Sequence, residues 1–136
     1  MTPRLTLTDY RTAAEFRYQV RHYLTFSEQC AREHGLTPGQ HQALLAIKGI
    51  PESREPTIGF LAERLFLQPH SAVELVDRLE EQGLAVRRRD RHDGRKVFVE
   101  LTVVGEEMLE RLAQCHIEEF QSIGPALIEA LVALLK

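Results

Sequence analysis

Cysteine is scarce in this chain of 136 residues, and the long apolar runs typical of membrane and secreted proteins are missing. The two cysteines, Cys30 and Cys115, lie far apart and form no C-x-x-C pair, which does not fit a disulfide scaffold. No stretch approaches the roughly 18 apolar residues of a membrane span, and Met1–Asp9 lacks the apolar core of a signal peptide. We therefore expect a cytoplasmic protein that does not interact with membranes.

The motifs of common enzyme classes are also missing. The sequence has no glycine-rich phosphate loop, no G-x-S-x-G nucleophile elbow and no zinc-protease H-E-x-x-H. We therefore expect neither an enzyme nor a cofactor. With 43% hydrophobic and 27% charged residues, the composition is that of one globular domain with a sizeable core.

Two short helical patterns in tandem are the first positive signal. Thr57 is placed to cap the first helix, in which apolar residues recur at helical spacing up to Leu65. Pro69 suits the first position of a second helix, which we expect to run to about Gln82, with Gly83 as its left-handed stop. The residues of this second helix that can face the core are Ala72, Val73, Val76 and Leu79.

An arginine-rich hairpin follows the second helix. From Lys96 to Leu101 the side chains alternate between two faces, which indicates a half-buried strand, and Arg87–Arg89 precede it as the opposing strand. Between Leu84 and Val97 six basic residues oppose two acidic ones, a net of +4, so the rest of a chain that totals −3 carries −7. A basic patch on an acidic protein indicates a local anionic partner, and arginines at a hairpin tip suit the phosphates and minor groove of DNA. The alternative is a charged hairpin that is simply solvated.

Longer helical patterns flank this region. Thr8 or Asp9 is expected to cap a first helix that runs to about His34, where Gly35 ends it. The apolar face of this helix is wider than one neighbouring helix requires, which suggests that it meets more than one surface. Thr37–Gln40 then has the pattern of a capping box at the start of the next helix.

The C-terminal part begins with Thr102 as the expected cap of another helix, which we expect Gly124-Pro125 to break. The last segment, A-L-I-E-A-L-V-A-L-L, is apolar nearly all round and too short for a bilayer. Burial between two copies of the chain explains this composition most simply. The alternative is a monomer that folds the last helix onto its own core.

Taken in order, these motifs carry a resemblance. L-A-E-R-L is followed by Pro69, V-D-R-L-E, G-L, R-R, D-x-x-D-G-R and V-E-L-T-x-x-G, without gaps from Leu61 to Gly105. This order resembles the MarR family of winged-helix transcription regulators, over roughly Leu36 to Leu112. The resemblance implies a mainly α fold with a small β-hairpin, namely a winged helix-turn-helix with N- and C-terminal dimerisation helices.

The same resemblance implies a function and a division of the chain. The family consists of homodimeric repressors, less often activators, that bind palindromic DNA operators and are released by small anions, oxidation or metals. We therefore expect residues 1–136 to form a single MarR-like domain. Its dimerisation lobe would comprise about 1–35 and 103–136, and its winged-helix DNA-binding lobe about 36–102.

The DNA-contacting residues follow from matched positions. The start of the second helix of the pair touches base edges and phosphates in the family, an arginine of the wing enters the minor groove, and an aspartate braces it. This chain departs from the family at Gly94, which replaces a commoner arginine, and at Glu74. The Glu74 carboxylate would repel a neighbouring phosphate, or would instead read a cytosine or face Arg78. With the basic residues of the hairpin, the expected contacts are Gln68, His70, Ser71, Glu74, Arg78, Arg88, Arg91, Asp93, Arg95 and Lys96.

A small-molecule effector is expected near the first two helices. Tyr23 and Phe26 can supply aromatic walls and His41 an imidazole for an anionic aromatic molecule, although each residue alone would equally complete a hydrophobic junction. Cys30 and His34, one helical turn apart, are weak candidates for a metal or redox site, without a diagnostic spacing. The other alternative is a winged-helix dimer that binds protein rather than DNA.

Overall fold

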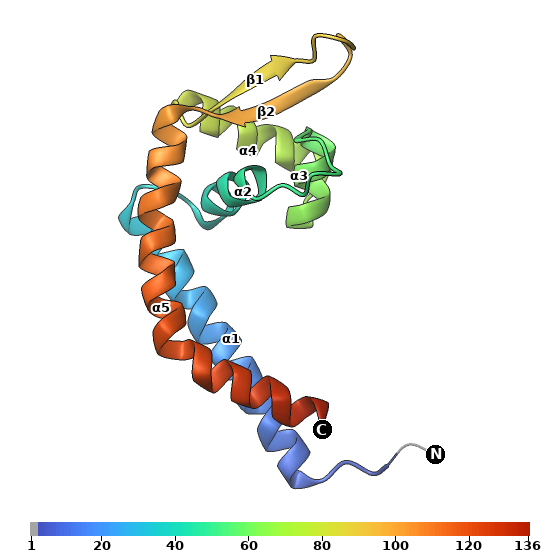
Figure 1. The fold of residues 1–136 in the computed structure, drawn as a ribbon, viewed down its shortest axis with the longest axis vertical. Coiled ribbons are helices and arrows are strands. Elements are labelled where there is room, and N and C mark those ends of the chain that lie inside the picture. Colours follow the sequence, from blue (N-terminus) through green and yellow to red (C-terminus); the bar gives the residue numbers. More distant parts are fainter. Residues whose placement is uncertain (1–2) are drawn as a thin grey trace. The chain divides into compact units, whose positions relative to one another are not determined.

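A computed structural model describes residues 3–136 of the chain, as five helices and two strands (Figure 1). The mainly α fold with one β-hairpin, predicted from the sequence, is confirmed. The elements are α1 (Leu7–Glu33), α2 (Pro38–Lys48), α3 (Ile58–Leu65), α4 (Pro69–Glu81), β1 (Ala85–Arg89), β2 (Val97–Leu101) and α5 (Val103–Leu135).

The chain divides into two compact units. One, here called the central unit, is Ala31–Ala113 and holds α2, α3, α4, the hairpin and the first turns of α5. The other, here called the terminal-helix unit, runs up to Cys30 and resumes at Gln114–Lys136, so it consists of most of α1 and the rest of α5. Each unit is described by itself below.

The core of the central unit is made by apolar side chains from each of its helices and from the hairpin. They include Leu44 of α2, Leu61 of α3, Val76 and Leu79 of α4, and Val99 of β2, all with no exposed surface. These residues recur at helical spacing or alternate along a strand, so each element buries one face. Burying five such side chains stabilises the unit by about 1.5–3 kcal/mol each.

The helix starts of the central unit are set by local side-chain caps. Thr37 and Gln40 form the predicted capping box, and the hydroxyl of Thr57 accepts a hydrogen bond from the amide of Phe60 at 3.1 Å. Pro69 is the first residue of α4, as predicted. The sequence predicts these caps because each depends only on two residues that are three positions apart.

The ends of α1, α3 and α4 use left-handed backbone. Gly35 (φ 80°) ends α1 and Gly83 (φ 72°) ends α4, and in both places the next amide bonds back to the last turn of the helix. The end of α3 differs, because Phe66 takes the left-handed conformation there with φ 54° and ψ 44°.

The hairpin is antiparallel, with Ala85 opposite Leu101 and Arg89 opposite Val97. Its tip projects away from the helices of the central unit (Figure 1). On its other edge β2 is held by the segment before α3, since the amide of Val99 donates to the carbonyl of Pro56 at 2.7 Å. The hairpin is thereby anchored at its base while its tip stays open.

Two predictions about the helices were wrong in detail. The cap of α1 is Thr6 rather than Thr8 or Asp9, because the Thr6 hydroxyl accepts from the Asp9 amide at 3.2 Å and the Asp9 carboxylate accepts from the Thr6 amide at 2.7 Å. Val73 of α4 does not face the core but is 40% exposed. It lies on the outer side of α4, beside the residues expected to meet DNA.

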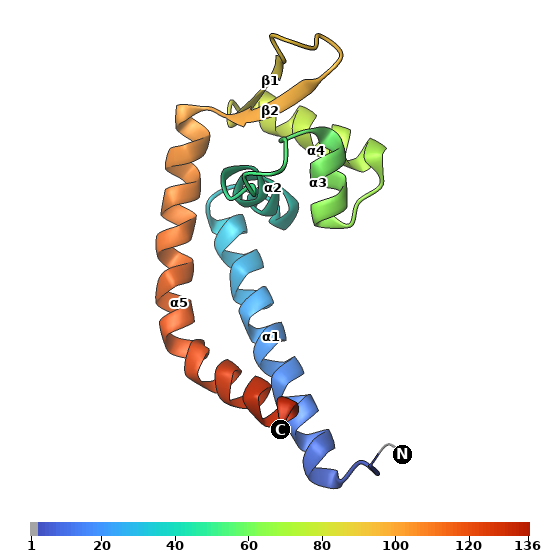
Figure 2. The ribbon, with the colours of Figure 1, turned by 45° about the vertical axis from the view of Figure 1, so that its right-hand side comes forward.

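The predicted break at Gly124-Pro125 was also wrong, because α5 continues through Pro125 to Leu135. A proline removes one amide donor and crowds the preceding turn, which bends a helix more often than it ends one when the rest of the helix is packed. Figure 2 shows α5 bending in its C-terminal half. No helix in residues 3–136 is both long and apolar enough to cross a membrane.

The terminal-helix unit is held by an aromatic cluster. Tyr23 of α1 stacks on Phe120 of α5 with ring centroids 4.7 Å apart, and the buried His116 bonds to the hydroxyl of Ser27 at 2.8 Å. Toward the C-terminus, Ile123 and Ala130 are also buried.

Candidate nucleic-acid interface

The start of α4 presents polar side chains to solvent. Gln68, its N-cap residue, and His70 are exposed, and Ser71 is half-buried. The first amides of a helix lack partners within it and carry partial positive charge, so this end of α4 suits an anion. The residues expected to touch DNA here lie at one surface, on one turn of helix.

The middle of α4 carries an acid and a base that do not pair with each other. Glu74 and Arg78 are both exposed, and neither has an ion pair within the described residues. Of the alternatives for Glu74, contact with Arg78 is therefore not realised in this structure. Its carboxylate lies open on the outer face of α4.

The tip of the hairpin is ordered by its own polar groups. Oδ1 of Asp93 accepts from the amide of Arg95 at 3.0 Å and from its Nε at 3.4 Å, and the Arg95 side chain is 94% exposed. Nη1 of Arg89 donates to the carbonyl of Gly94 at 2.8 Å, which ties the first strand to the turn. Arg91 is exposed and takes part in no ion pair among residues 3–136. The tip thus offers guanidinium groups at its outer edge.

Other basic residues of the hairpin are already paired inside the chain. Arg88 reaches Glu100 across the strands at 2.5 Å, and Nζ of Lys96 lies 3.1 Å from Glu55 in the segment before α3. Because its ammonium is hydrogen-bonded to Glu55 and attracted by that charge, the pKa of Lys96 is raised above its ordinary value. These two expected DNA contacts would have to share their charge with an internal carboxylate.

Arg87 joins the hairpin to α4. Its guanidinium bonds to Glu80, lies 2.9 Å from Asp77 and reaches the carbonyl of Val73 at 3.4 Å. Arg87 is the least exposed of the hairpin's paired bases, with 28% of its side chain accessible. Sequence reasoning counted it as part of the basic patch, whereas the structure gives it a positioning role.

The hairpin is also fixed to the start of α5. The Thr102 hydroxyl donates to the carbonyl of Gly83 at 2.6 Å and accepts from the amide of Gly105 at 3.0 Å, and its own amide donates to the carbonyl of Leu84. A Cβ added at Gly105 would lie 2.0 Å from the Leu84 carbonyl oxygen. Glycine is therefore required at this close approach between α5 and the turn that follows α4.

A second basic cluster lies beside α3, and sequence analysis missed it. The guanidinium groups of Arg54 and Arg64 lie over the ring of the buried Phe60 at 5.0 and 5.1 Å. Arg54 also pairs with Glu63 at 2.5 Å. The hydrogen bond and the charge of Arg54 lower the pKa of Glu63. Arg64 lies on the last turn of α3 and is exposed. No motif marks these residues, because Arg54 lies in an irregular segment.

Comparison with known proteins relates this arrangement to a family. A model described as the MarR family matches residues 34–96, which include α2, α3, α4 and most of the hairpin. The uncharacterised helix-turn-helix-type transcriptional regulator YkoM of Bacillus subtilis is 29% identical over 128 residues, covering 89% of this chain and 81% of its own. Over residues 34–96 the chain is therefore similar to the MarR family.

Solved structures agree with this assignment. A MarR family protein from Bacillus stearothermophilus is 29% identical, with a TM-score of 0.64 over 84% of this chain and 80% of that one. A single-residue variant of MepR from S. aureus, bound to an oligodeoxyribonucleotide, shares the fold at 18% identity, with a TM-score of 0.72 over 91% of this chain and 97% of that one. MarR-family regulators bind DNA and act as dimers. This chain is therefore a transcriptional regulator and not an enzyme.

The expected effector residues lie in different units. Tyr23 and Phe26 belong to the terminal-helix unit, where both rings pack edge-on against His116, at 6.0 and 5.6 Å. Partial burial raises the pKa of the Tyr23 phenol. His41 belongs to the central unit and is only 5% exposed.

The two cysteines are both thiols in the structure. Cys30 is buried with 2% exposure, and Cys115 is half-buried. Within residues 3–136 no group of three or more histidine, cysteine or acidic side chains is placed to hold a metal ion. His34, the other weak candidate, is half-buried.

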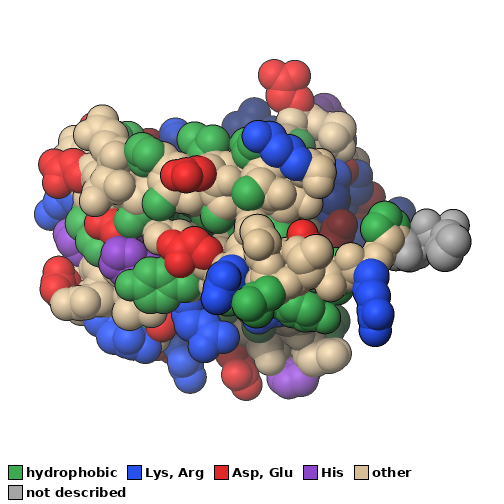
Figure 3. Space-filling view, turned by 90° about the horizontal axis from the view of Figure 1, so that it is seen from below, with side chains coloured by type: hydrophobic (Ala, Val, Ile, Leu, Met, Phe, Trp, Pro, Cys, Tyr) green, Lys and Arg blue, Asp and Glu red, His purple; other side chains and the backbone are tan. Residues whose placement is uncertain are grey.

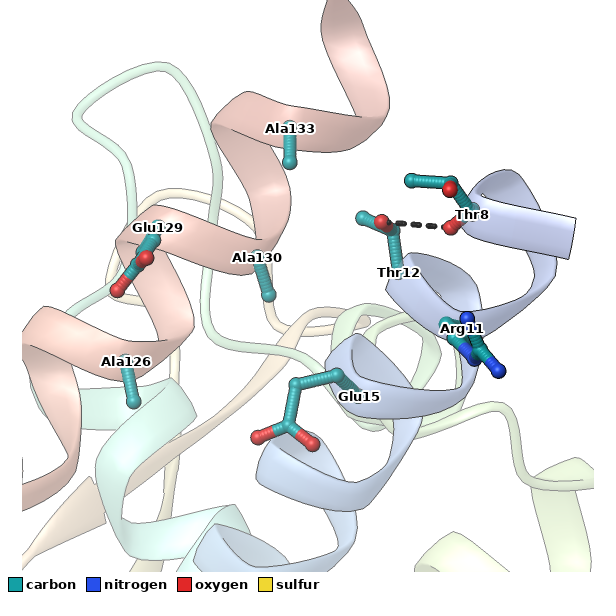
Figure 4. A pocket seen from close by; sticks show the side chains of 8 residues that line it. All are labelled: Thr8, Arg11, Thr12, Glu15, Ala126, Glu129, Ala130 and Ala133. Atoms are coloured by element: carbon teal, nitrogen blue, oxygen red, sulfur yellow. Dashed lines mark hydrogen bonds between the residues drawn. The ribbon is translucent and has the colours of Figure 1, made fainter.

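The terminal-helix unit contains a hollow of about 470 Å³ between α1 and α5. Figure 4 shows three alanines of α5 facing Thr8, Thr12 and the charged side chains of α1. Figure 3, a view from below, shows hydrophobic side chains exposed among charged ones on that face of the molecule. The large exposed hydrophobic residues near the end of α5 are Ile128, Leu131, Val132, Leu134 and Leu135.

Proposed function

We propose that this chain is a homodimeric repressor that binds a palindromic DNA operator and is released by a small effector. The observation that carries the DNA-binding part is the pairing, within one compact unit, of an exposed polar start of α4 with an arginine-bearing hairpin tip. Arg95 at this tip is 94% exposed and braced by Asp93. An exposed guanidinium keeps its full charge for a ligand. Because this one is already held in one orientation, binding would cost it little further conformational entropy.

In this proposal the two elements have different tasks. The start of α4, with Gln68, His70 and Ser71, enters the major groove and contacts base edges, where the donor and acceptor pattern distinguishes all four base pairs. Arg95 enters the neighbouring minor groove, where its charge meets the negative potential between the phosphates. Arg87, bonded to Glu80, sets the spacing between these elements.

The homodimer is supported by the apolar residues that a single chain leaves exposed. Ile128 is 64% exposed and Leu131 is 43% exposed, on a segment with little charge to keep it solvated. A second copy would cover these side chains and fill the hollow beside Ala130. A two-fold dimer also places two copies of α4 one DNA turn, about 34 Å, apart, which requires a palindromic site.

A selection from random duplexes tests the DNA-binding proposal. We expect enrichment of an inverted repeat whose half-sites are centred about one helical turn apart, and affinity that falls steeply with salt. Recovery of no preferred duplex, with weak binding that is equal on all sequences, would argue instead for the protein-binding alternative. Transcription from a promoter that carries the selected site then separates a repressor from an activator.

Sedimentation tests the dimer. Replacing Ile128 with Asp should yield a monomer, because a buried carboxylate without a partner costs several kcal/mol in each subunit. Val104→Asp is the matched control, since Val104 is 52% exposed on the same helix but in the central unit. A dimer that survives Ile128→Asp would place the interface elsewhere.

For the effector we propose a small aromatic anion recognised with the help of Tyr23 and Phe26 of the terminal-helix unit. Aromatic side chains and an imidazole are groups that bind such a molecule, and both rings already form a cluster with His116. Aromatic carboxylates should raise the melting temperature and weaken operator binding in parallel, and Tyr23→Ala should suppress both effects. If zinc or an oxidant releases the operator while the aromatic acids do not, the sensor involves Cys30 and His34 instead.

A further inference from the structure

Phe66 combines two features that are unfavourable in a folded chain by itself. Its side chain is 95% exposed, so the ring contributes nothing to the core. Its backbone has φ 54° and ψ 44°, the left-handed region that side chains with a Cβ rarely adopt. Among residues 3–136 it is the only residue other than glycine with positive φ.

The chain uses glycine at the comparable positions. Gly35 and Gly83 end α1 and α4 with φ 80° and 72°, whereas the end of α3 has phenylalanine. For phenylalanine the left-handed conformation is energetically unfavourable, and here its aromatic ring is also left in water. No contact in the described part of the chain compensates for either cost. Strain that persists without structural benefit is most often found at functional sites.

The position of Phe66 indicates which function. It is the C-cap of α3, in the turn of the helix-turn-helix, two residues before the N-cap Gln68. Two residues apart, their Cα atoms are separated by at most about 7 Å, so the ring lies beside the part of α4 that is expected to enter the major groove.

The surroundings of Phe66 suit nucleic acid better than protein. Its nearest exposed neighbours in sequence are Arg64, Gln68, Glu63 and Pro69, of which only Pro69 is apolar. The exposed large hydrophobic residues of the central unit lie on other elements, so Phe66 is a single ring in a polar setting. A protein interface would instead present a contiguous apolar patch around it.

We infer that Phe66 is a specificity-determining residue that packs against the C5 methyl group of a thymine in the operator. The ring has neither donor nor acceptor, and the thymine methyl is the one apolar group that the major groove presents. This inference rests on the proposed DNA-binding function and adds to it a residue outside α4. It means that each half-site holds a thymine at a fixed position.

Two substitutions separate a DNA contact from a structural role. Phe66→Gly removes the ring and relieves the backbone, so the melting temperature should stay the same or rise by a few degrees, while operator affinity falls about 5- to 10-fold. The salt dependence of binding should not change, because no charge is removed. Phe66→Asn, which tolerates the left-handed conformation, should behave in the same way. Val104→Ala, which trims an exposed apolar side chain of the same unit, is the matched control and should leave affinity unchanged.

Replacing one thymine at a time by deoxyuridine, which lacks the methyl group, identifies the contact. At one position in each half-site the wild-type protein should lose affinity by a factor similar to that of Phe66→Gly, and the variant should be insensitive there. Wild-type protein that selects no duplex would refute the proposed function and this inference with it. Wild-type protein that binds, with Phe66→Gly binding equally or losing affinity without coupling to any thymine, would overturn this inference alone.

Discussion

The carboxylate of Asp93 holds Arg95 twice, through its backbone amide at 3.0 Å and through Nε at 3.4 Å, while the end of the arginine side chain stays in solvent. The bond to Nε leaves the Nη groups available for a ligand. The Asp93 side chain is less exposed, at 35%, so the brace lies at the foot of the exposed guanidinium. The Arg95 guanidinium is therefore already oriented in the absence of a ligand.

Replacing Arg95 with Ala should therefore weaken operator binding by about 1–3 kcal/mol and lower the magnitude of the salt slope. Folding should hardly change, since the side chain contacts only its own turn. Fluorescence anisotropy at several salt concentrations measures both quantities. Asp93→Asn keeps the arginine, so it should weaken binding less and leave the salt slope unchanged. If Arg95→Ala binds the operator as tightly as the wild-type protein, the Arg95 side chain does not contribute to DNA binding.

Substitutions at the start of α4 should change sequence preference rather than general affinity. We expect Ser71→Ala and His70→Ala to alter the selected operator, because their side chains face base edges in the proposed complex. Repeating the duplex selection with each variant measures this. Losses of the same size on operator and random DNA would show that both residues only contact the backbone.

Glu74→Gln distinguishes two roles of an unpaired carboxylate on α4. If Glu74 only repels phosphates, the variant should bind every duplex more tightly, by about 1 kcal/mol or less at moderate salt. If Glu74 accepts a hydrogen bond from a cytosine, the preference at one base pair should change while other sequences are unaffected. Affinities on a set of single-base operator variants decide between these outcomes.

The glycine at the start of α5 should not tolerate even one added carbon. Gly105→Ala would bring a Cβ to 2.0 Å from the Leu84 carbonyl oxygen, a backbone atom that cannot move aside alone. We expect destabilisation by about 3 kcal/mol or more in urea unfolding. Gly59→Ala is the matched control, because the added Cβ would lie 3.7 Å from the Thr57 hydroxyl oxygen, an ordinary contact distance. Since Gly59 lies in α3, that substitution should stabilise the protein by up to about 1 kcal/mol.

The pair formed by Arg54 and Glu63 predicts a small acid-sensitive contribution to stability. The hydrogen bond and charge of Arg54 lower the pKa of Glu63, so folding favours the ionised carboxylate. The resulting stabilisation is present above the ordinary pKa of glutamate and is lost as the pH falls through the lowered value. In Arg54→Ala the Glu63 pKa should rise toward its ordinary value, which carboxyl NMR titration measures. Because both side chains are exposed, solvent screens the pair, and the effect on unfolding should be small.

The sequence predicted the elements that depend on nearby residues. Thr57, Pro69 and Gly83 marked the ends of α3 and α4 because caps and stops act over three or four residues. The hairpin followed from alternation and from the turn residues at its tip. The family resemblance, carried by motifs in a fixed order, supplied the helix-turn-helix with its wing.

What depends on distant parts of the chain was not predictable. Pro125 was expected to end a helix, but α5 continues through it, and local preference does not report the packing that holds a bent helix together. Arg87 and Lys96 looked like members of one basic patch, yet their partners Glu80 and Glu55 lie on other elements. The spacing of these residues along the sequence does not indicate either ion pair. The left-handed backbone of Phe66 was missed for a related reason, since this conformation usually signals glycine.

The contact between Gly105 and Leu84 has a mechanical consequence. The hydrogen bonds from Thr102 to the carbonyls of Gly83 and Leu84, and the close approach at Gly105, join the first turn of α5 rigidly to the turn that ends α4. A rotation of that first turn must therefore rotate the end of α4 with it, without an intervening hinge to absorb the motion. A signal that twists the start of α5 by a few degrees would change the angle of α4, the helix proposed to contact base edges, directly.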